Sequence, residues 1–114
     1  MDTTTTLDPV EFAKALADET RQQIMTLLCC RELSVNEIVA ELRAAGRKVT
    51  QPTVSHHLAI LRSAHLVHTR REGQQVYYTL NRDQVAVCCG QLLLRLAPLT
   101  PAATQFQSLL AEKG

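Results

Sequence analysis

The stretch Gln51-Pro-Thr-Val-Ser-His-His-Leu58 decides the fold class of this chain. Thr50 is suited to cap a helix there, and Pro52 fits its first turn, where a missing backbone N–H costs little. Apolar side chains at helical spacing predict that one face of this helix packs on a core. They are Val54, Leu58 and Leu61. Polar side chains occupy the other faces, as in a helix that enters the major groove of DNA.

Five polar side chains of this helix are candidates for contacts with DNA: Gln51, Thr53, Ser55, His56 and His57. Gln51 can form two hydrogen bonds with an adenine, and Thr53 also offers a methyl group to thymine. The hydroxyls of Thr53 and Ser55 are short enough to reach phosphates or base edges, and both histidines can donate to either. The alternative is an ordinary helix cap followed by surface histidines.

A basic hairpin is predicted directly after this helix. Residues 66–71 and 75–80 alternate well enough for two strands, with Glu72-Gly-Gln74 as the turn. Arg70 and Arg71, near the tip, can reach the phosphate backbone or the minor groove, whose negative potential favours arginine. A short helix, a turn, a helix with a polar face and a hairpin, in this order, predict a winged helix-turn-helix domain.

The rest of the chain completes this domain. Three earlier helices are predicted, with Asp8, residues 18–20 and Ser34 as their caps, and a last helix is predicted over residues 82–97. The expected fold class is mainly α with a small β-hairpin (α+β). Its parts are a disordered segment (residues 1–8), a DNA-binding and sensor domain (9–97) and a C-terminal tail that can form a short helix (98–114).

Charge is distributed unevenly along a chain whose net charge is only +1. Residues 1–42 hold eight acidic and three basic side chains, whereas residues 43–82 hold seven basic side chains and one acid, Glu72. A basic segment on a nearly neutral chain indicates a surface that binds phosphates. The alternative is a solvated charged surface, which is common for any charge cluster.

The 114 residues form one domain, and their composition favours a cytoplasmic protein. No apolar run reaches the ~20 residues needed to cross a bilayer, and Met1–Val10 is too polar for a signal peptide. We therefore expect no membrane partner.

Four cysteines form two adjacent pairs, Cys29-Cys30 and Cys88-Cys89. In a reducing compartment such cysteines indicate metal-binding or redox thiols rather than a disulfide framework.

Three segments together resemble the ArsR/SmtB family of metal- and redox-responsive bacterial repressors. They are Leu16-Ala-Asp-Glu-Thr-Arg21, Gln51-Pro-Thr-Val-Ser-His-His-Leu58 and Arg71-Glu-Gly-Gln-Gln-Val-Tyr-Tyr78. The resemblance covers about residues 9–97. It implies a homodimer, joined through its first and last helices, that binds an inverted-repeat operator in double-stranded DNA without a cofactor. It also implies repression of an adjacent efflux or detoxification operon, and no enzymatic activity is expected.

The chain departs from the family pattern in two places. Glu19 stands where the family usually has proline, and residues 43–48 lengthen the link into the helix that begins at Gln51. The family's best-known sensor sites are also unmatched. Ser34 and Asn36 occupy the positions of its Cys-x-Cys arsenic site, and no histidine follows His68 to supply its zinc site.

Cys88 and Cys89 resemble the adjacent pair that some arsenic-responsive members carry in the last helix. The implied inducer is arsenic(III) or antimony(III), inorganic or as a methylated or aryl arsenical, for which thiolates are the protein's soft ligands. Neighbouring side chains on a helix diverge by about 100°, so chelation requires a local adjustment that Gly90 could ease. A third ligand could come from Cys29, Cys30 or the partner subunit.

Other functions remain open from the residues alone. The thiols could oxidise or accept persulfide instead of binding a metalloid. Cys29 and Cys30 could be small apolar side chains at a helix end. Structural zinc across all four cysteines lacks the usual C-x₂₋₄-C spacing. A catalytic thiol protein lacks a Cys-x-x-Cys motif and an evident base, and a winged helix used only for protein contacts leaves the basic segment unexplained.

Overall fold

The elements follow one another in the order expected of a winged helix-turn-helix. The computed structural model describes residues 8–113. Its elements are α1 (Pro9–Leu16), α2 (Glu19–Leu28), β1 (Leu33–Ser34), α3 (Val35–Ala44), α4 (Gln51–Ser63), β2 (Val67–Glu72), β3 (Gln75–Leu80), α5 (Arg82–Leu96) and α6 (Pro101–Lys113). The predicted fold class is confirmed. The prediction of disorder over residues 1–8 falls, apart from Asp8, outside the described residues.

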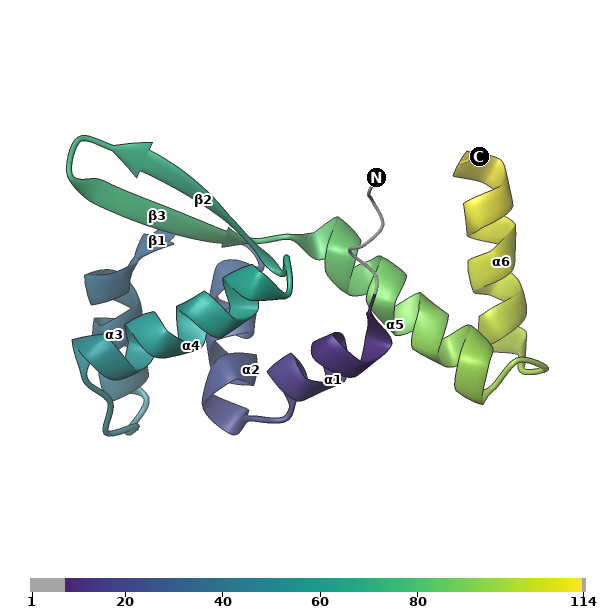
Figure 1. Cartoon of the computed structure of the whole chain (residues 1–114), viewed down its shortest axis with the longest axis horizontal. Coiled ribbons are helices and arrows are strands. Elements are labelled where there is room, and N and C mark those ends of the chain that lie inside the picture. The colour runs from purple at the N-terminus through teal and green to yellow at the C-terminus, as the bar shows by residue number, and fades with distance from the viewer. Residues whose placement is uncertain (1–7, 114) are drawn as a thin grey trace.

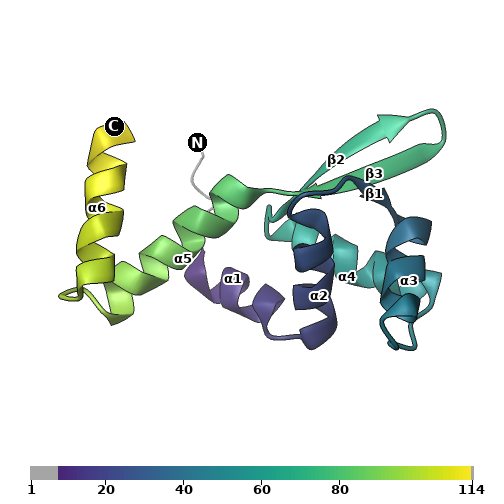
Figure 2. The ribbon, with the colours of Figure 1, turned by 180° about the vertical axis from the view of Figure 1, so that it is seen from behind.

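The hairpin and the last helix lie at opposite ends of the molecule. Helices α2 to α4 lie beneath β2 and β3, and α5 leads from the sheet past α1 to α6 (Figure 1). The view from behind shows the same arrangement (Figure 2). The molecule is accordingly elongated, with extents of 43 × 30 × 22 Å. Over residues 8–113, no helix combines the length and apolarity needed to span a membrane.

Helix α4 lies in the core because one of its faces is wholly apolar. Val54, Leu58 and Leu61 are at most 1% exposed, and the helix packs against α2, α3 and β2. Thr50 caps it by accepting a hydrogen bond from the backbone N–H of Thr53 at 3.4 Å. Burying each apolar side chain stabilises the fold by roughly 1.5–3 kcal/mol. This face therefore determines which side of α4 is left to solvent.

The hairpin forms two strands of an antiparallel sheet with the order β1-β3-β2. Its register runs from Val67 opposite Leu80 to Glu72 opposite Gln75. Gly73 turns the chain with a φ of +62°, a left-handed conformation that favours glycine. All of β2 beyond Val67 is exposed, so the hairpin projects as a wing, as predicted.

The short strand β1 was not predicted from the sequence. Leu33 and Ser34 pair with Tyr78 and Tyr77 of β3, and two residues are too few to show an alternating pattern. Ser34 also begins α3. Its hydroxyl accepts from the N–H of Glu37 at 3.2 Å, and the Glu37 carboxylate accepts from the N–H of Ser34 at 2.9 Å. The predicted Ser34 cap is thereby confirmed, and Glu37 completes a capping box.

Helices α5 and α6 meet where Gly90 faces Phe106. A side chain at position 90 would collide with the Phe106 ring, so the absence of a side chain allows α6 to lie against α5. Ala103, on α6, is fully buried. The sequence suggested that Gly90 eases an adjustment of the neighbouring thiols. The structure shows in addition that this glycine has a packing role.

Gly90→Ala should destabilise the fold, although alanine favours a helix interior over glycine by roughly 1 kcal/mol. The added methyl must displace Phe106, and overpacking typically costs about 1–3 kcal/mol. In a Phe106→Ala background the collision is absent, so the same change should stabilise by about 1 kcal/mol. Urea unfolding of the single and double variants measures both effects. If Gly90→Ala changed the stability in the same direction in both backgrounds, this packing role would be contradicted.

Candidate nucleic-acid interface and thiol groups

The amino-terminal half of α4 presents polar side chains on the faces turned away from the core. Gln51, Thr53 and His56 are exposed, and Ser55 is half-buried. The hydroxyl of Thr53 lies 2.9 Å from that of Thr50 at the cap. Four of the five side chains proposed from the sequence for this helix are thus brought together at its solvent-facing start.

His57 is placed differently from these four. Its Nδ1 accepts a hydrogen bond from the Arg21 guanidinium at 3.2 Å, since arginine can only donate. Burial lowers the pKa of His57 below its usual value, Arg21 and His56 lower it further, and Asp18 opposes them. The half-buried, neutral ring is therefore a partner of Arg21 within the protein.

Arg21 joins α1, α2 and α4 at one point, a role that sequence reasoning missed. Its guanidinium donates to the carbonyls of Ala15 at 2.7 Å and Lys14 at 3.1 Å. Carbonyls in the last turn of a helix lack their regular helical partners. Arg21 therefore supplies a donor to the carbonyl of Ala15 and a second donor to that of Lys14, which also accepts from the N–H of Ala17. The sequence did offer a signal, because Arg21 ends one of the segments that carry the family resemblance.

The two wing arginines differ in their surroundings. Arg70 donates to both carboxylate oxygens of Glu32, at 2.9 and 2.8 Å, and to Glu72 at 2.7 Å. Its guanidinium also lies 4.9 Å from the centre of the Tyr77 ring. These hydrogen bonds to Glu32 and Glu72 raise the pKa of Arg70 well above its usual value. Arg71 is exposed, and among residues 8–113 no acid is paired with it.

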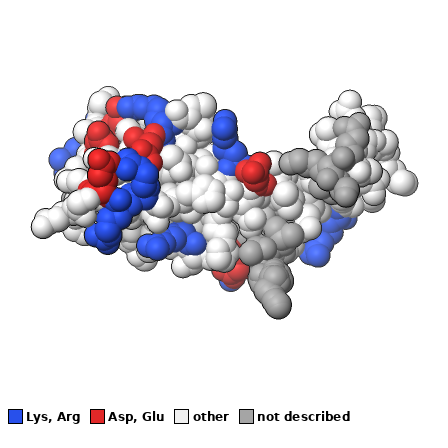
Figure 3. Space-filling model, turned by 90° about the horizontal axis from the view of Figure 1, so that it is seen from above, with Lys and Arg blue, Asp and Glu red and all other residues white. Residues whose placement is uncertain are grey.

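Part of the basic segment is neutralised by acids from earlier in the chain. Arg47 forms an ion pair with Glu19 at 3.1 Å, and Arg43 donates to the carbonyl of Val49 at 2.9 Å. Charged side chains of both signs gather over the end of the molecule that carries the wing (Figure 3). Fewer basic side chains of residues 43–82 are therefore without a partner in the protein than a count of basic residues indicates.

The adjacent thiols of α5 face different surroundings. Cys88 is 3% exposed and lines a small hollow with Phe12, Ala64 and His65. Burial raises the pKa of the Cys88 thiol. Cys89 is exposed. The two predicted metal ligands are therefore not brought together on one side of α5.

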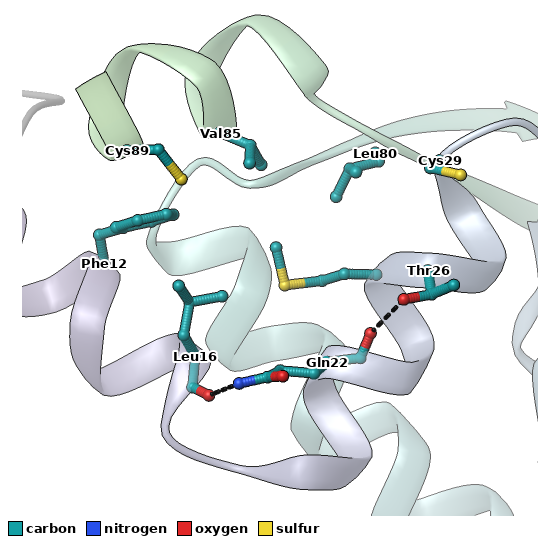
Figure 4. Close-up of a pocket in the computed structure, with 9 residues that line it drawn as sticks. Phe12, Leu16, Gln22, Thr26, Cys29, Leu80, Val85 and Cys89 are labelled. Carbon is teal, nitrogen blue, oxygen red and sulfur yellow. Dashed lines mark hydrogen bonds between the residues drawn. The ribbon is translucent and has the colours of Figure 1, made fainter. Parts of the chain in front are cut away.

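Cys89 instead lines a cavity of about 410 Å³ between α1, α2, β3 and α5. Most of its wall is apolar and includes Phe12, Leu16 and Met25. Cys89 points its sulfur into this space (Figure 4). Cys29 lies at the opposite end with its sulfur turned away. Thiols from α2 and α5 thus border one cavity without meeting in it.

The sulfurs of Cys29 and Cys30 lie close together, 3.4 Å apart. Cys29 is half-buried and Cys30 is exposed. The hydrogen bond between them raises the pKa of Cys29, as does burial, while Arg82 lowers it. In the described part of the chain, no three His, Cys, Asp or Glu side chains gather as a ready-made metal site.

Comparison with known proteins agrees with this architecture. Residues 18–69 match the family described as bacterial regulatory protein, arsR family. The chain is 42% identical over 87 residues to the transcriptional activator HlyU of Vibrio cholerae, covering 76% of this chain and 75% of that protein. It is 45% identical over 76 residues to the HTH-type transcriptional regulator KmtR of Mycobacterium tuberculosis, covering 67% and 55%. Identity to the arsenic resistance transcriptional regulator ArsR1 of Pseudomonas putida is 47% over 77 residues, covering 66% and 55%.

The matched region spans about half the length of KmtR and of ArsR1. Among solved structures, HlyU from Vibrio cholerae superposes with a TM-score of 0.59 at 42% identity, covering 77% of this chain and 89% of that one. An ArsR-like transcriptional regulator from Rhodococcus sp. RHA1 gives a TM-score of 0.61 at 25% identity, covering 92% and 89%. The fold and the relatives are those of DNA-binding regulators and not of enzymes. This chain therefore belongs to the ArsR family of bacterial transcriptional regulators.

Proposed function

We propose that this chain is a cytoplasmic repressor that holds an operator through α4 and leaves it when arsenic(III) or antimony(III) binds its thiols. The observation that carries the DNA-binding half is the exposed polar start of α4. Gln51, Thr53, Ser55 and His56 lie there together, and amide, hydroxyl and imidazole groups are suited to base edges and phosphates. DNA binding itself requires no cofactor.

Two copies joined through α1 and α5 would present two α4 helices to an inverted repeat. Val10 on α1 is 57% exposed and Leu96 on α5 is 77% exposed. Both line an apolar hollow together with Leu92, and exposed apolar surface of this kind marks interaction sites. A second copy on this surface would place half-sites about one helical turn of DNA apart, or a multiple of it.

The sensing half of the proposal concerns α5. Cys89 presents a thiol inside a cavity next to α1, and α5 packs against α1. Thiolates are soft ligands for arsenic(III), and the relative ArsR1 is named for arsenic resistance. Cys88 would have to leave its buried position to become the second ligand. That movement would displace α5 in the proposed dimer and change the separation of the two α4 helices.

A redox- or persulfide-sensing repressor of the same fold is the second candidate. It is favoured by the position of Cys29 and Cys89, because thiols from α2 and α5 at the two ends of one cavity could be joined by oxidation after local movement. Mass spectrometry after treatment with peroxide, persulfide or phenylarsine oxide distinguishes the candidates by the adduct formed at Cys88 and Cys89.

Gln51→Ala should weaken operator binding by about 1–3 kcal/mol and relax the preference at one base pair. Gel shifts with operators altered one base pair at a time measure this change. Gln74→Ala removes an exposed amide at the wing turn and should leave every base preference intact. An equal loss for Gln51→Ala on all DNA sequences would mean that Gln51 contacts only the backbone.

Arg71→Ala should reduce the slope of log affinity against log salt by roughly one unit, because one phosphate contact no longer releases a counterion. Arg70→Ala should change the slope less, since Glu32 and Glu72 already offset its charge. Binding titrations over a range of salt concentrations measure both slopes. A larger effect from Arg70 would place that side chain on the phosphates.

His57→Gln should alter the pH dependence of stability. The folded protein holds the pKa of His57 below the usual 6.5, so it binds fewer protons than the unfolded chain and loses stability as the pH falls below 6.5. Removing His57 should flatten this fall in urea-unfolding measurements. The matched change His56→Gln should leave most of this fall in place, since burial is the main cause of the lowered pKa of His57, and should weaken operator binding instead. The reverse pattern would mean that His57 contacts the operator and that His56 causes the pH dependence of stability.

Cys88→Ser and Cys89→Ser should each keep operator binding and lose release by phenylarsine oxide. Cys29→Ser and Cys30→Ser should remain at least partly inducible. Alkylation followed by mass spectrometry should also modify Cys89 before Cys88, because Cys89 is exposed while Cys88 is buried with a raised pKa. Loss of induction only in the Cys29 and Cys30 variants would place the switch at the end of α2.

A further inference from the structure

The two adjacent-cysteine pairs differ in backbone geometry. Cys88 and Cys89 both lie inside α5, where neighbouring side chains diverge by about 100°. Cys29 is the C-cap of α2, and Cys30 follows it outside the helix. Released from helical geometry, Cys30 brings its sulfur to 3.4 Å from that of Cys29. The pair at the end of α2 is thus already arranged as a chelate.

This separation suits two sulfurs bound to one atom. Thiolates at about 2.3 Å from a shared centre, the distance found at zinc, lie roughly 3.3–3.8 Å from each other for bond angles between a right angle and a tetrahedral one. The observed 3.4 Å falls within this range. A soft centre can therefore bind both sulfurs without rearrangement of the backbone.

The surroundings of the pair admit a ligand. Cys29 and Cys30 line a hollow of about 570 Å³ together with Arg31, Thr79 and Arg82. Cys30 is exposed and Cys29 half-buried, so solutes reach both sulfurs. The hollow leaves room for a substituent on the bound atom.

The number of thiols selects the chemical class of the ligand. Glu32 lines the same hollow but is paired with Arg70, and among residues 8–113 no three His, Cys, Asp or Glu side chains gather as a metal site. Inorganic arsenite prefers three thiolates, whereas an arsenic(III) atom that carries one carbon substituent needs two. In the reaction with R–As(OH)₂, two S–H and two As–O bonds break, and two As–S bonds form. The protons leave with the hydroxyls as two water molecules, and no oxidant or reductant takes part.

We propose that Cys29 and Cys30 form a second, self-contained site for a singly substituted trivalent arsenical, independent of the α5 thiols. The sulfurs supply both protein ligands, and the substituent occupies the adjoining hollow. The proposal does not rest on release of DNA, because binding at this site can be measured on the protein alone.

The test uses the full chain carrying Cys88→Ser and Cys89→Ser, with phenylarsine oxide as the probe. One equivalent should remain bound after gel filtration, both remaining thiols should become unreactive, and the adduct should map to residues 29–30. Adding Cys30→Ser, at an exposed position, should weaken retention about 100-fold, because chelation gives the second thiol a high effective concentration. An excess of a monothiol should leave the probe bound, whereas a dithiol competitor should remove it.

Two results would overturn the site: no retention by the variant that keeps only Cys29 and Cys30, or retention unaffected by Cys30→Ser. Cys29→Ser is a second variant and should cause the same loss. Urea unfolding establishes that each variant is folded before binding is measured. Failure of Cys89→Ser to lose DNA release would count against the proposed α5 switch alone, since this assay contains neither DNA nor the α5 thiols.

Discussion

The burial of one apolar face of α4 is the constraint on which the rest of the structure depends. With Val54, Leu58 and Leu61 inside, α2 and α3 are placed beside the helix and its polar start is turned to solvent. Arg21 adds a directional contact, since it holds His57 while it binds the last carbonyls of α1. The surface proposed for DNA is thus determined by the core and by one half-buried arginine, Arg21.

Periodicity and capping were sufficient to predict the helices and the hairpin, because those signals are local. The contact between Gly90 and Phe106 and the pairing of β1 with β3 depend on residues far apart in the sequence. His57 shows the same limit at the candidate site. Its sequence neighbours suggested a DNA contact, and they gave no sign of its hydrogen bond to Arg21, 36 residues away.

The two departures from the family pattern meet in the folded chain. Glu19, which stands where proline is usual, forms an ion pair with Arg47 in the lengthened link before α4. Arg47 also donates to Thr20 at 3.0 Å, so the link is held against the start of α2. Along the sequence, Glu19 belongs to the acidic segment 1–42 and Arg47 to the basic segment 43–82. Folding brings these two side chains together. The count of basic residues along the sequence therefore overstates the positive charge that is left unpaired.

Local backbone geometry also explains why identical pairs of cysteines are not equivalent. In a regular helix the side chains of Cys88 and Cys89 diverge, and that of Cys88 is buried in the core. The end of α2 removes that restriction, and the sulfurs of Cys29 and Cys30 come within 3.4 Å of each other. Spacing in the sequence is the same in both pairs, so only the position of each pair relative to a helix end distinguishes them.

The pairing of Arg70 with Glu32 has a consequence for encounters with DNA of random sequence. Arg70 and Arg71 are the wing's basic charges, Glu72 is its acid, and Glu32 adds a second acid from outside the wing. Taken together, the hairpin and its bound acid carry no net charge. Attraction to phosphates of any sequence grows with positive charge, and a genome offers roughly 10⁶–10⁹ competing sites. In the proposed complex, a wing neutralised by its own chain limits the loss of regulator to bulk DNA and leaves the choice of site to α4.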